Sequence, residues 1–162
     1  MKLEKKAIVY RPATIDDVPA LVDCRVRFLN EHFSHPEDDA TKALRASLRD
    51  YFVRAIPSRE YIAWVAEYEG KIIATSGMVV WQKPAIYGGV ESGRLGYLLN
   101  FYTVSEARRK GISTRLLNEL IKGAKSLGLK YLHLHASKDG INIYRRAGFV
   151  EPDEPELELR LT

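Results

Sequence analysis

Apolar residues recur along the chain at two kinds of spacing, and each spacing predicts one kind of element. Spacings of three and four residues predict helices over 15–33, 44–55, 112–127 and 138–146. Short apolar or alternating runs are typical of strands. These runs predict strands over 7–11, 61–68, 71–81, 95–104, 131–135, 149–151 and 157–161.

The resulting order of elements is β-αα-βββ-α-β-α-ββ. A tight turn at Glu69-Gly70 joins two adjacent strands into a hairpin, and a strand-helix-strand crossover comes late in the chain. This combination predicts an α/β (α+β) fold, with a single mixed, mostly antiparallel sheet flanked by helices on both faces. Because no repeat or linker divides the chain, we expect residues 1–162 to form a single domain.

Composition and charge narrow the classes of function. The net charge of +4 is modest, and the basic residues are dispersed except at 108–110 and at Lys2, Lys5 and Lys6, which does not favour nucleic acid as a partner. The lone Cys24 rules out an internal disulfide. No apolar run approaches 18 residues and the start lacks the apolar core of a signal peptide, so we expect no membrane partner and a cytoplasmic location.

One basic stretch, Arg108-Arg109-Lys110-Gly111-Ile112-Ser113-Thr114, lies between a predicted strand and a predicted helix. Gly111 lets the backbone approach an anion closely, and the first N–H groups of the helix have no partner inside it. The helix dipole adds roughly half a positive charge at this end. The stretch therefore indicates a phosphate-binding turn. The alternative is a solvated basic turn capped by Ser113 or Thr114.

A second stretch, residues 137–149, contains Tyr144 on a short predicted helix, with Ile141 and Ala147 near the same face. Taken alone, a tyrosine in this setting is typical of the edge of a core. The crossover is expected to bring strands 98–104 and 131–135 side by side. The phosphate turn and the face of Tyr144 would then open at the same edge of the sheet.

Three segments in this order resemble the GNAT N-acetyltransferase superfamily. Arg108-x-x-Gly111-x-Ser113 is similar to the acyl-CoA pyrophosphate turn of that family, with Ser113 in place of a glycine or alanine. Ile143-Tyr144-x-x-x-Gly148-Phe149 resembles its Leu-Tyr-x-x-x-Gly-Phe signature, and Arg11-Pro12-Ala13-Thr14-x-x-Asp17 its common opening. The element order also matches, so the resemblance spans the whole chain.

The resemblance implies an N-acetyltransferase that moves the acetyl group of acetyl-CoA to a primary amine by direct attack in a ternary complex. In that mechanism the amides from Arg109 to Thr114 hold the pyrophosphate, and Tyr144 protonates the departing thiolate. The strand end would pair with the pantetheine amides and polarise the thioester carbonyl. Ser137 lies where many members carry an asparagine that faces the pantetheine arm. The implied co-substrate residues are Phe101, Tyr102, Thr103, Arg108, Arg109, Lys110, Gly111, Ile112, Ser113, Thr114 and Ser137.

The acceptor amine must also lose a proton. With a lysine-like pKa of ~10.4, making it neutral at pH 7 costs about 4.6 kcal/mol. A base or a chain of water molecules is therefore expected, and the sequence does not rank the candidates. They are Glu67, Glu91, Glu106, His133 and His135.

The expected acceptor is a small-molecule or peptide amine. Acidic residues at 37–39 and 151–156 would favour a cationic acceptor, or are ordinary helix-start and turn acids. His32 and His35 are too few to indicate a metal site, so no metal is expected.

Two other classes stay open. A non-catalytic acyl-CoA-binding module would sense without transferring, and Tyr144 argues against it. A nucleic-acid binder would use 108–110 as a phosphate clamp, but the chain lacks a basic face with interleaved aromatics. A homodimer is one of the oligomeric states that the sequence leaves open.

Overall fold

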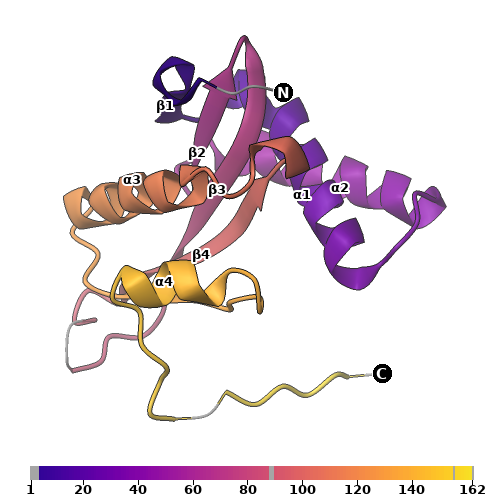
Figure 1. The fold of residues 1–162 in the computed structure, drawn as a ribbon. Helices are drawn as coiled ribbons and strands as arrows, with labels where there is room; N and C mark the ends of the chain where they lie inside the picture. Colours follow the sequence, from indigo (N-terminus) through magenta and orange to yellow (C-terminus); the bar gives the residue numbers. More distant parts are fainter. Residues whose placement is uncertain (1–3, 88–89, 155, 162) are drawn as a thin grey trace.

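The computed structural model describes residues 4–87, 90–154 and 156–161 (Figure 1). Lys2 and part of the acidic segment 151–156 therefore lie outside the described residues. One sheet contains the strands β1 (Val9–Pro12), β2 (Tyr61–Tyr68), β3 (Lys71–Gln82), β4 (Arg94–Thr103) and β5 (Leu132–Leu134) in that spatial order. Neighbouring strands are antiparallel except β4 and β5, which are parallel. The predicted mixed, mostly antiparallel sheet is confirmed.

Helices cover both faces of this sheet, as the sequence predicts. The helices α1 (Val18–Phe33) and α2 (Asp39–Ala55) pack on one face, where Val26 and Phe52 are almost completely buried. The helices α3 (Ile112–Ser126) and α4 (Ile141–Arg146) lie on the other face (Figure 1). Among the described residues, no helix is long and apolar enough to cross a membrane.

Helix α3 shows why the periodicity is informative. Leu116, Leu117 and Leu120 are spaced by one and three residues, and all three are fully buried against the sheet. At roughly 25 cal/mol per Å² of apolar surface, burying each leucine contributes about 1.5–3 kcal/mol. This packing fixes the direction of α3, and with it the position of the turn that precedes the helix.

Helix ends differ from the predicted bounds where side chains cap them. Helix α2 begins at Asp39 rather than at 44, because the Asp38 carboxylate accepts a hydrogen bond from the Thr41 amide at 2.9 Å. Helix α1 begins at Val18, after a 3₁₀ turn over Ile15–Asp17. The Asp17 carboxylate accepts a hydrogen bond from the Thr14 amide at 2.7 Å, which caps the start of this turn.

The last two predicted strands, 149–151 and 157–161, are wrong. The described residues of both segments form no strand, and Leu157, Leu159 and Leu161 are more than 80% exposed. The edge of the sheet beside them is β5, which is only three residues long. Alternating leucines form a strand only where an edge offers hydrogen-bond partners, and this edge offers few.

Strand β4 contains a bulge that decides the geometry of the site. The β3–β4 register shifts between Thr75 and Gly77, and Asn100 has a left-handed φ of 59°. Thr75 donates a hydrogen bond to the Asn100 carbonyl at 3.1 Å, and the Asn100 side chain donates to the Tyr61 hydroxyl at 2.8 Å. The bulge therefore has two buried side-chain anchors.

The bulge and the short β5 together leave the end of β4 open. Strand β5 pairs with Gly96–Leu98 of β4, and the register stops there. Because of the extra residue at Asn100, Leu98 and Phe101 both face α3 and α4. Residues 99–103 of β4 thus have one edge without a β5 partner in the described part of the chain.

Candidate active site

The turn between β4 and α3 exposes backbone N–H groups. After a 3₁₀ turn at Ser105–Ala107, Arg109 and Gly111 both have left-handed backbones, with φ of 63° and 82°. Gly111 is the N-cap residue of α3, and no side chain of the described residues caps the helix. A Cβ added at Gly111 would meet nothing within 4 Å. The first N–H groups of α3 therefore face open space, as an anion site requires.

This geometry bears on the second interpretation of the turn, in which Ser113 or Thr114 caps the helix. A solvated turn capped by Ser113 or Thr114 would show a side-chain cap on the helix. Instead, the Ser113 hydroxyl shares a 3.0 Å hydrogen bond with the Thr103 hydroxyl. That contact links the end of β4 to the first turn of α3 and leaves the amides uncovered.

The side chain of Arg108 is directed toward α1 rather than toward the turn amides. Its Nε donates to the Thr103 carbonyl at 2.9 Å, and its Nη2 donates to Glu31 Oε2 at 2.6 Å. The Tyr102 hydroxyl donates to the other Glu31 oxygen at 2.6 Å. Arg108, expected as a co-substrate ligand, is therefore placed to hold the turn against α1.

Glu31 is a residue that the sequence reasoning missed. Partial desolvation raises its pKa, but the hydrogen bonds from Tyr102 and Arg108 outweigh this and hold the pKa below its usual value. An acid near the C-terminal end of a helix opposes the helix dipole, and this unfavourable position was the available signal. Glu31 and Arg108 are 77 residues apart, so no local pattern connects them.

The other cations of the turn differ in their surroundings. The Lys110 ammonium donates to the Glu106 carbonyl at 2.9 Å. The Arg109 side chain is exposed. Among the described residues, no hydrogen bond or ion pair holds the Arg109 side chain, in contrast to Arg108 and Lys110.

Tyr144 lies on α4 beside the open end of β4. Its ring makes edge-to-face contacts with Phe101 at 5.6 Å and Phe149 at 5.9 Å between centroids. Burial raises the pKa of the Tyr144 hydroxyl to about 12. Among the described residues, no group makes a hydrogen bond to this hydroxyl. It is therefore protonated at neutral pH and available as a donor.

Ser137 lies in the turn before α4. Its hydroxyl accepts a hydrogen bond from the Gly140 amide at 3.2 Å. The Ser137 side chain therefore stabilises the turn that positions Tyr144, and its expected contact to a pantetheine arm stays a prediction.

The structure distinguishes the five candidate bases by their partners. Glu67 accepts from Arg11 at 2.8 Å, in a network that also contains Asp17. Glu91 lies 3.8 Å from the Lys130 ammonium, and Glu106 is exposed in the 3₁₀ turn. The two histidines are on and just after β5, where β4 and β5 separate.

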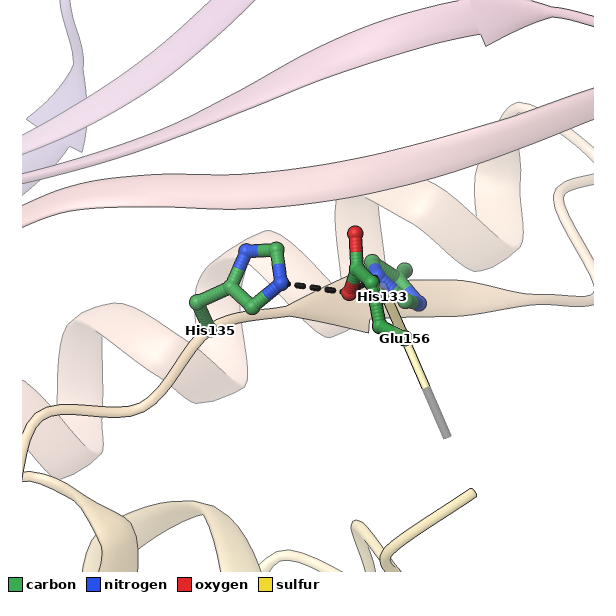
Figure 2. Close-up of side chains that lie close together, drawn as sticks. All are labelled: His133, His135 and Glu156. Atoms are coloured by element: carbon green, nitrogen blue, oxygen red, sulfur yellow. Dashed lines mark hydrogen bonds and ion pairs between the residues drawn. The ribbon is translucent and has the colours of Figure 1, made fainter. Parts of the chain in front are cut away.

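His133 and His135 form a cluster with Glu156 (Figure 2). His135 Nε2 lies 2.5 Å from Glu156 Oε2, and His133 Nε2 lies 3.7 Å from the same oxygen. The Tyr97 hydroxyl is 2.6 Å from His135 Nδ1, and the Trp81 ring stacks on Tyr97 at 4.5 Å. Both histidines are candidate bases in the sequence, but no pattern in the sequence joins them to Glu156. The path of the C-terminal segment brings that residue back to β5, and no periodicity encodes this path.

Most acids that were expected near an acceptor have partners within the protein. Asp38 caps α2, Glu37 pairs with Arg45 at 3.0 Å, and Asp39 pairs with Lys42 at 2.8 Å. Glu151 pairs with Arg145. The segment 37–39 therefore has a structural role in starting α2, and it supports acceptor steering less than the sequence suggested.

Comparisons with known proteins identify relatives along nearly the whole chain. Residues 23–149 match the model of the acetyltransferase (GNAT) family. A structure of a predicted acetyltransferase with acetyl-CoA from Clostridium acetobutylicum is 34% identical and has a TM-score of 0.83. The match covers 94% of this chain and 96% of that chain.

A GCN5-related N-acetyltransferase from Ralstonia eutropha JMP134 is 25% identical, with a TM-score of 0.81 and coverage of 94% and 98%. A ribosomal-protein-alanine N-acetyltransferase from Brucella melitensis biovar Abortus 2308 is 15% identical, with a TM-score of 0.69 and coverage of 96% and 100%, and shows the shared fold alone. A search of curated proteins gives no significant match.

Proposed function

Because the chain belongs to the GNAT acetyltransferase family, we propose that it transfers the acetyl group of acetyl-CoA to a primary amine. The observation that carries this proposal is the open end of β4, where Phe101 contacts the Tyr144 ring and Thr103 contacts Ser113 in the first turn of α3. The side of this opening next to α3 suits a pyrophosphate, and the side next to Tyr144 suits a departing thiolate. The C. acetobutylicum relative, solved with acetyl-CoA, supports the choice of co-substrate.

The proposed binding mode uses the backbone. The amides from Arg109 to Thr114 hold the pyrophosphate, with the positive end of the α3 dipole behind them. The pantetheine arm pairs with residues 99–103 of β4, where β5 leaves the edge open. An N–H group of this edge polarises the thioester carbonyl and stabilises the oxyanion that forms on attack.

In the proposed reaction the amine nitrogen attacks the thioester carbon in a ternary complex, and the carbon–sulfur bond breaks. Tyr144 donates to the sulfur as negative charge develops there, and the amine proton leaves to a base or to water. A phenol of pKa about 12 is a weaker acid than a thiol of about 8.5. Its help is therefore that of a strong hydrogen bond completed by solvent protons, worth on the order of 10²-fold in rate.

The same turn would also serve a protein that binds acyl-CoA without transferring it. A screen of amine acceptors, scored by free thiol released from acetyl-CoA, separates the two functions. We expect acetyl-CoA to bind and at least one class of amine to release thiol well above hydrolysis. Aminoglycosides, polyamines and peptides with free N-termini are suitable acceptors. Tight binding with no amine-dependent thiol release would instead establish a sensing module.

A further inference from the structure

A cluster of side chains on and just after β5 has the composition of a metal site. We propose that His133, His135 and Glu156 bind a divalent transition-metal ion of the Zn²⁺ type, which ties the C-terminal segment to β5 (Figure 2). The proposal does not depend on acetyl transfer. It rests on the ligand types, on their positions and on the support behind them.

The two histidines are placed by strand geometry. They are two residues apart in and just after β5, so both imidazoles lie on the same side of the strand. Their rings are 5.6 Å apart between centroids. A pair of imidazoles on one rigid strand reaches a metal with little loss of backbone entropy.

Glu156 supplies a third ligand from a distant part of the chain. One ligand atom from each of the three residues lies within 4.8 Å of the other two. Among the described residues, this is the sole group of three or more such side chains that could hold a metal ion. Ligand atoms of a tetrahedral ion with bonds of ~2.0–2.1 Å lie about 3.3 Å apart. The 2.5 Å contact of His135 with Glu156 must therefore widen, and the widest pair of ligand atoms must close by at most about 1.5 Å. Both side chains of that contact are more than half exposed, so rotation about their side-chain bonds can supply this.

Tyr97 supplies the support that metal-binding histidines usually have. Its oxygen lies 2.6 Å from His135 Nδ1, and when that nitrogen carries the proton, Nε2 offers its lone pair toward Glu156. The Trp81 ring, stacked on Tyr97 with planes within 5°, holds the tyrosine in place. Two imidazoles and a carboxylate favour Zn²⁺, Ni²⁺ or Cu²⁺ over Mg²⁺ or Ca²⁺.

Nearby charges oppose each other. The positive charge of Lys83 is close enough to Glu156 to interact with it, and it lowers the attraction of the cluster for a cation. The negative charge of Glu158 interacts with Tyr97, and it raises that attraction. Without metal, the cluster is held by the hydrogen bond between His135 and Glu156. Metal binding releases the proton of that bond and replaces it with two coordinate bonds to the ion.

The proposed ion would change the state of the C-terminal segment. That segment forms no strand in its described residues, and Glu156 is 21 residues beyond His135. An ion shared by Glu156 and β5 closes this stretch into a loop and lowers the number of conformations open to it. We therefore expect Zn²⁺ to slow amide hydrogen exchange in residues 150–161 specifically.

The test is a Zn²⁺ titration of protein without a histidine tag, in competition with a chromophoric chelator, together with hydrogen exchange. We expect one Zn²⁺ per chain, with binding weakened at least about 10-fold in His135→Ala and in Glu156→Ala. Tyr97 is not a proposed ligand, but its hydroxyl supports His135, so Tyr97→Phe is expected to weaken Zn²⁺ binding by about the same factor. His35→Ala and Glu154→Ala are the matched controls, since they remove an exposed histidine and an exposed acid that are not part of the cluster, and they should leave binding unchanged.

Circular dichroism checks that each variant is folded, which is expected because the substituted side chains of the two ligand variants are largely exposed. The proposal is overturned if Zn²⁺ binds weaker than the chelator with no 1:1 component. It is equally overturned if the control variants weaken binding as much as the ligand variants. Unchanged exchange in 150–161 on saturation would refute the tie to β5.

Discussion

Gly111 gives the sharpest test of the anion site at α3. Its φ of 82° lies in the left-handed region, and a side chain there would project into open space. Gly111→Asp costs about 1 kcal/mol of backbone strain, offset by about 0.5–1 kcal/mol from an acid at the helix N-terminus. The free protein should therefore keep its stability within about 1 kcal/mol, or a Tm within about 2–4 °C.

The effect of Gly111→Asp on the affinity for CoA should be far larger. At about 5 Å from the pyrophosphate, the new carboxylate opposes each phosphate charge by roughly 1–3 kcal/mol at an effective dielectric constant of about 20–80. That corresponds to an affinity about 5- to 150-fold lower. Calorimetric titration with CoA measures the affinity, and the CoA-induced rise in Tm gives an independent value.

Gly128 provides a matched control at the other end of α3. It has a φ of 72°, and a Cβ there also meets nothing within 4 Å. Gly111→Ala and Gly128→Ala therefore cost the same strain, but only the first approaches the proposed pyrophosphate. CoA affinity that survives intact in Gly111→Asp would refute the anion site. So would an equal loss in the two alanine variants.

Three further predictions concern the supports of the site. Glu31→Gln should release Arg108, lower the affinity for CoA about 3- to 10-fold and cost about 1 kcal/mol of stability. As a control on the same helix, Asp23→Asn should leave the affinity measured by titration with CoA unchanged. Tyr144 keeps its proton to about pH 12 when folded but loses it near pH 10 when unfolded, so the free energy of unfolding should fall as pH rises from 10 to 12. Urea unfolding should show a shallower fall in Tyr144→Phe, and an identical fall would refute the burial argument. The pKa of Asp17 is lowered by hydrogen bonds from Arg11, so its stabilisation is present above pH 4 and lost as pH falls through the folded pKa. Asp17→Asn should cost about 1–3 kcal/mol in urea unfolding at pH 7, and this cost should shrink steadily as the pH is lowered below 4.

Local patterns were sufficient to predict most of the fold. The buried leucines of α3 and the β2–β3 hairpin follow from spacing and turn residues within a few positions. The Asp38 cap shows a local signal that was present in the sequence and not used, since an aspartate three residues before Thr41 marks a helix start.

The features that were missed depend on packing between distant segments. The bulge at Asn100 is fixed by Thr75 and by Tyr61, 39 residues away. An asparagine tolerates a left-handed backbone, but this tolerance alone does not predict a bulge. The last two strands failed for a related reason, because an alternating pattern does not reveal whether a partner edge exists.

The measurement that tests the proposed function most directly is the kinetics of Tyr144→Phe with the best acceptor from the amine screen. The variant keeps the ring that packs on Phe101 and Phe149, so the fold and the Kd for CoA should change by less than about a factor of two or three. Loss of the hydroxyl should lower kcat on the order of 10²-fold, or about 2.7 kcal/mol of barrier. A kcat that stays within about a factor of two or three of the parent enzyme would contradict the role of Tyr144 as the hydrogen-bond donor to the leaving thiolate.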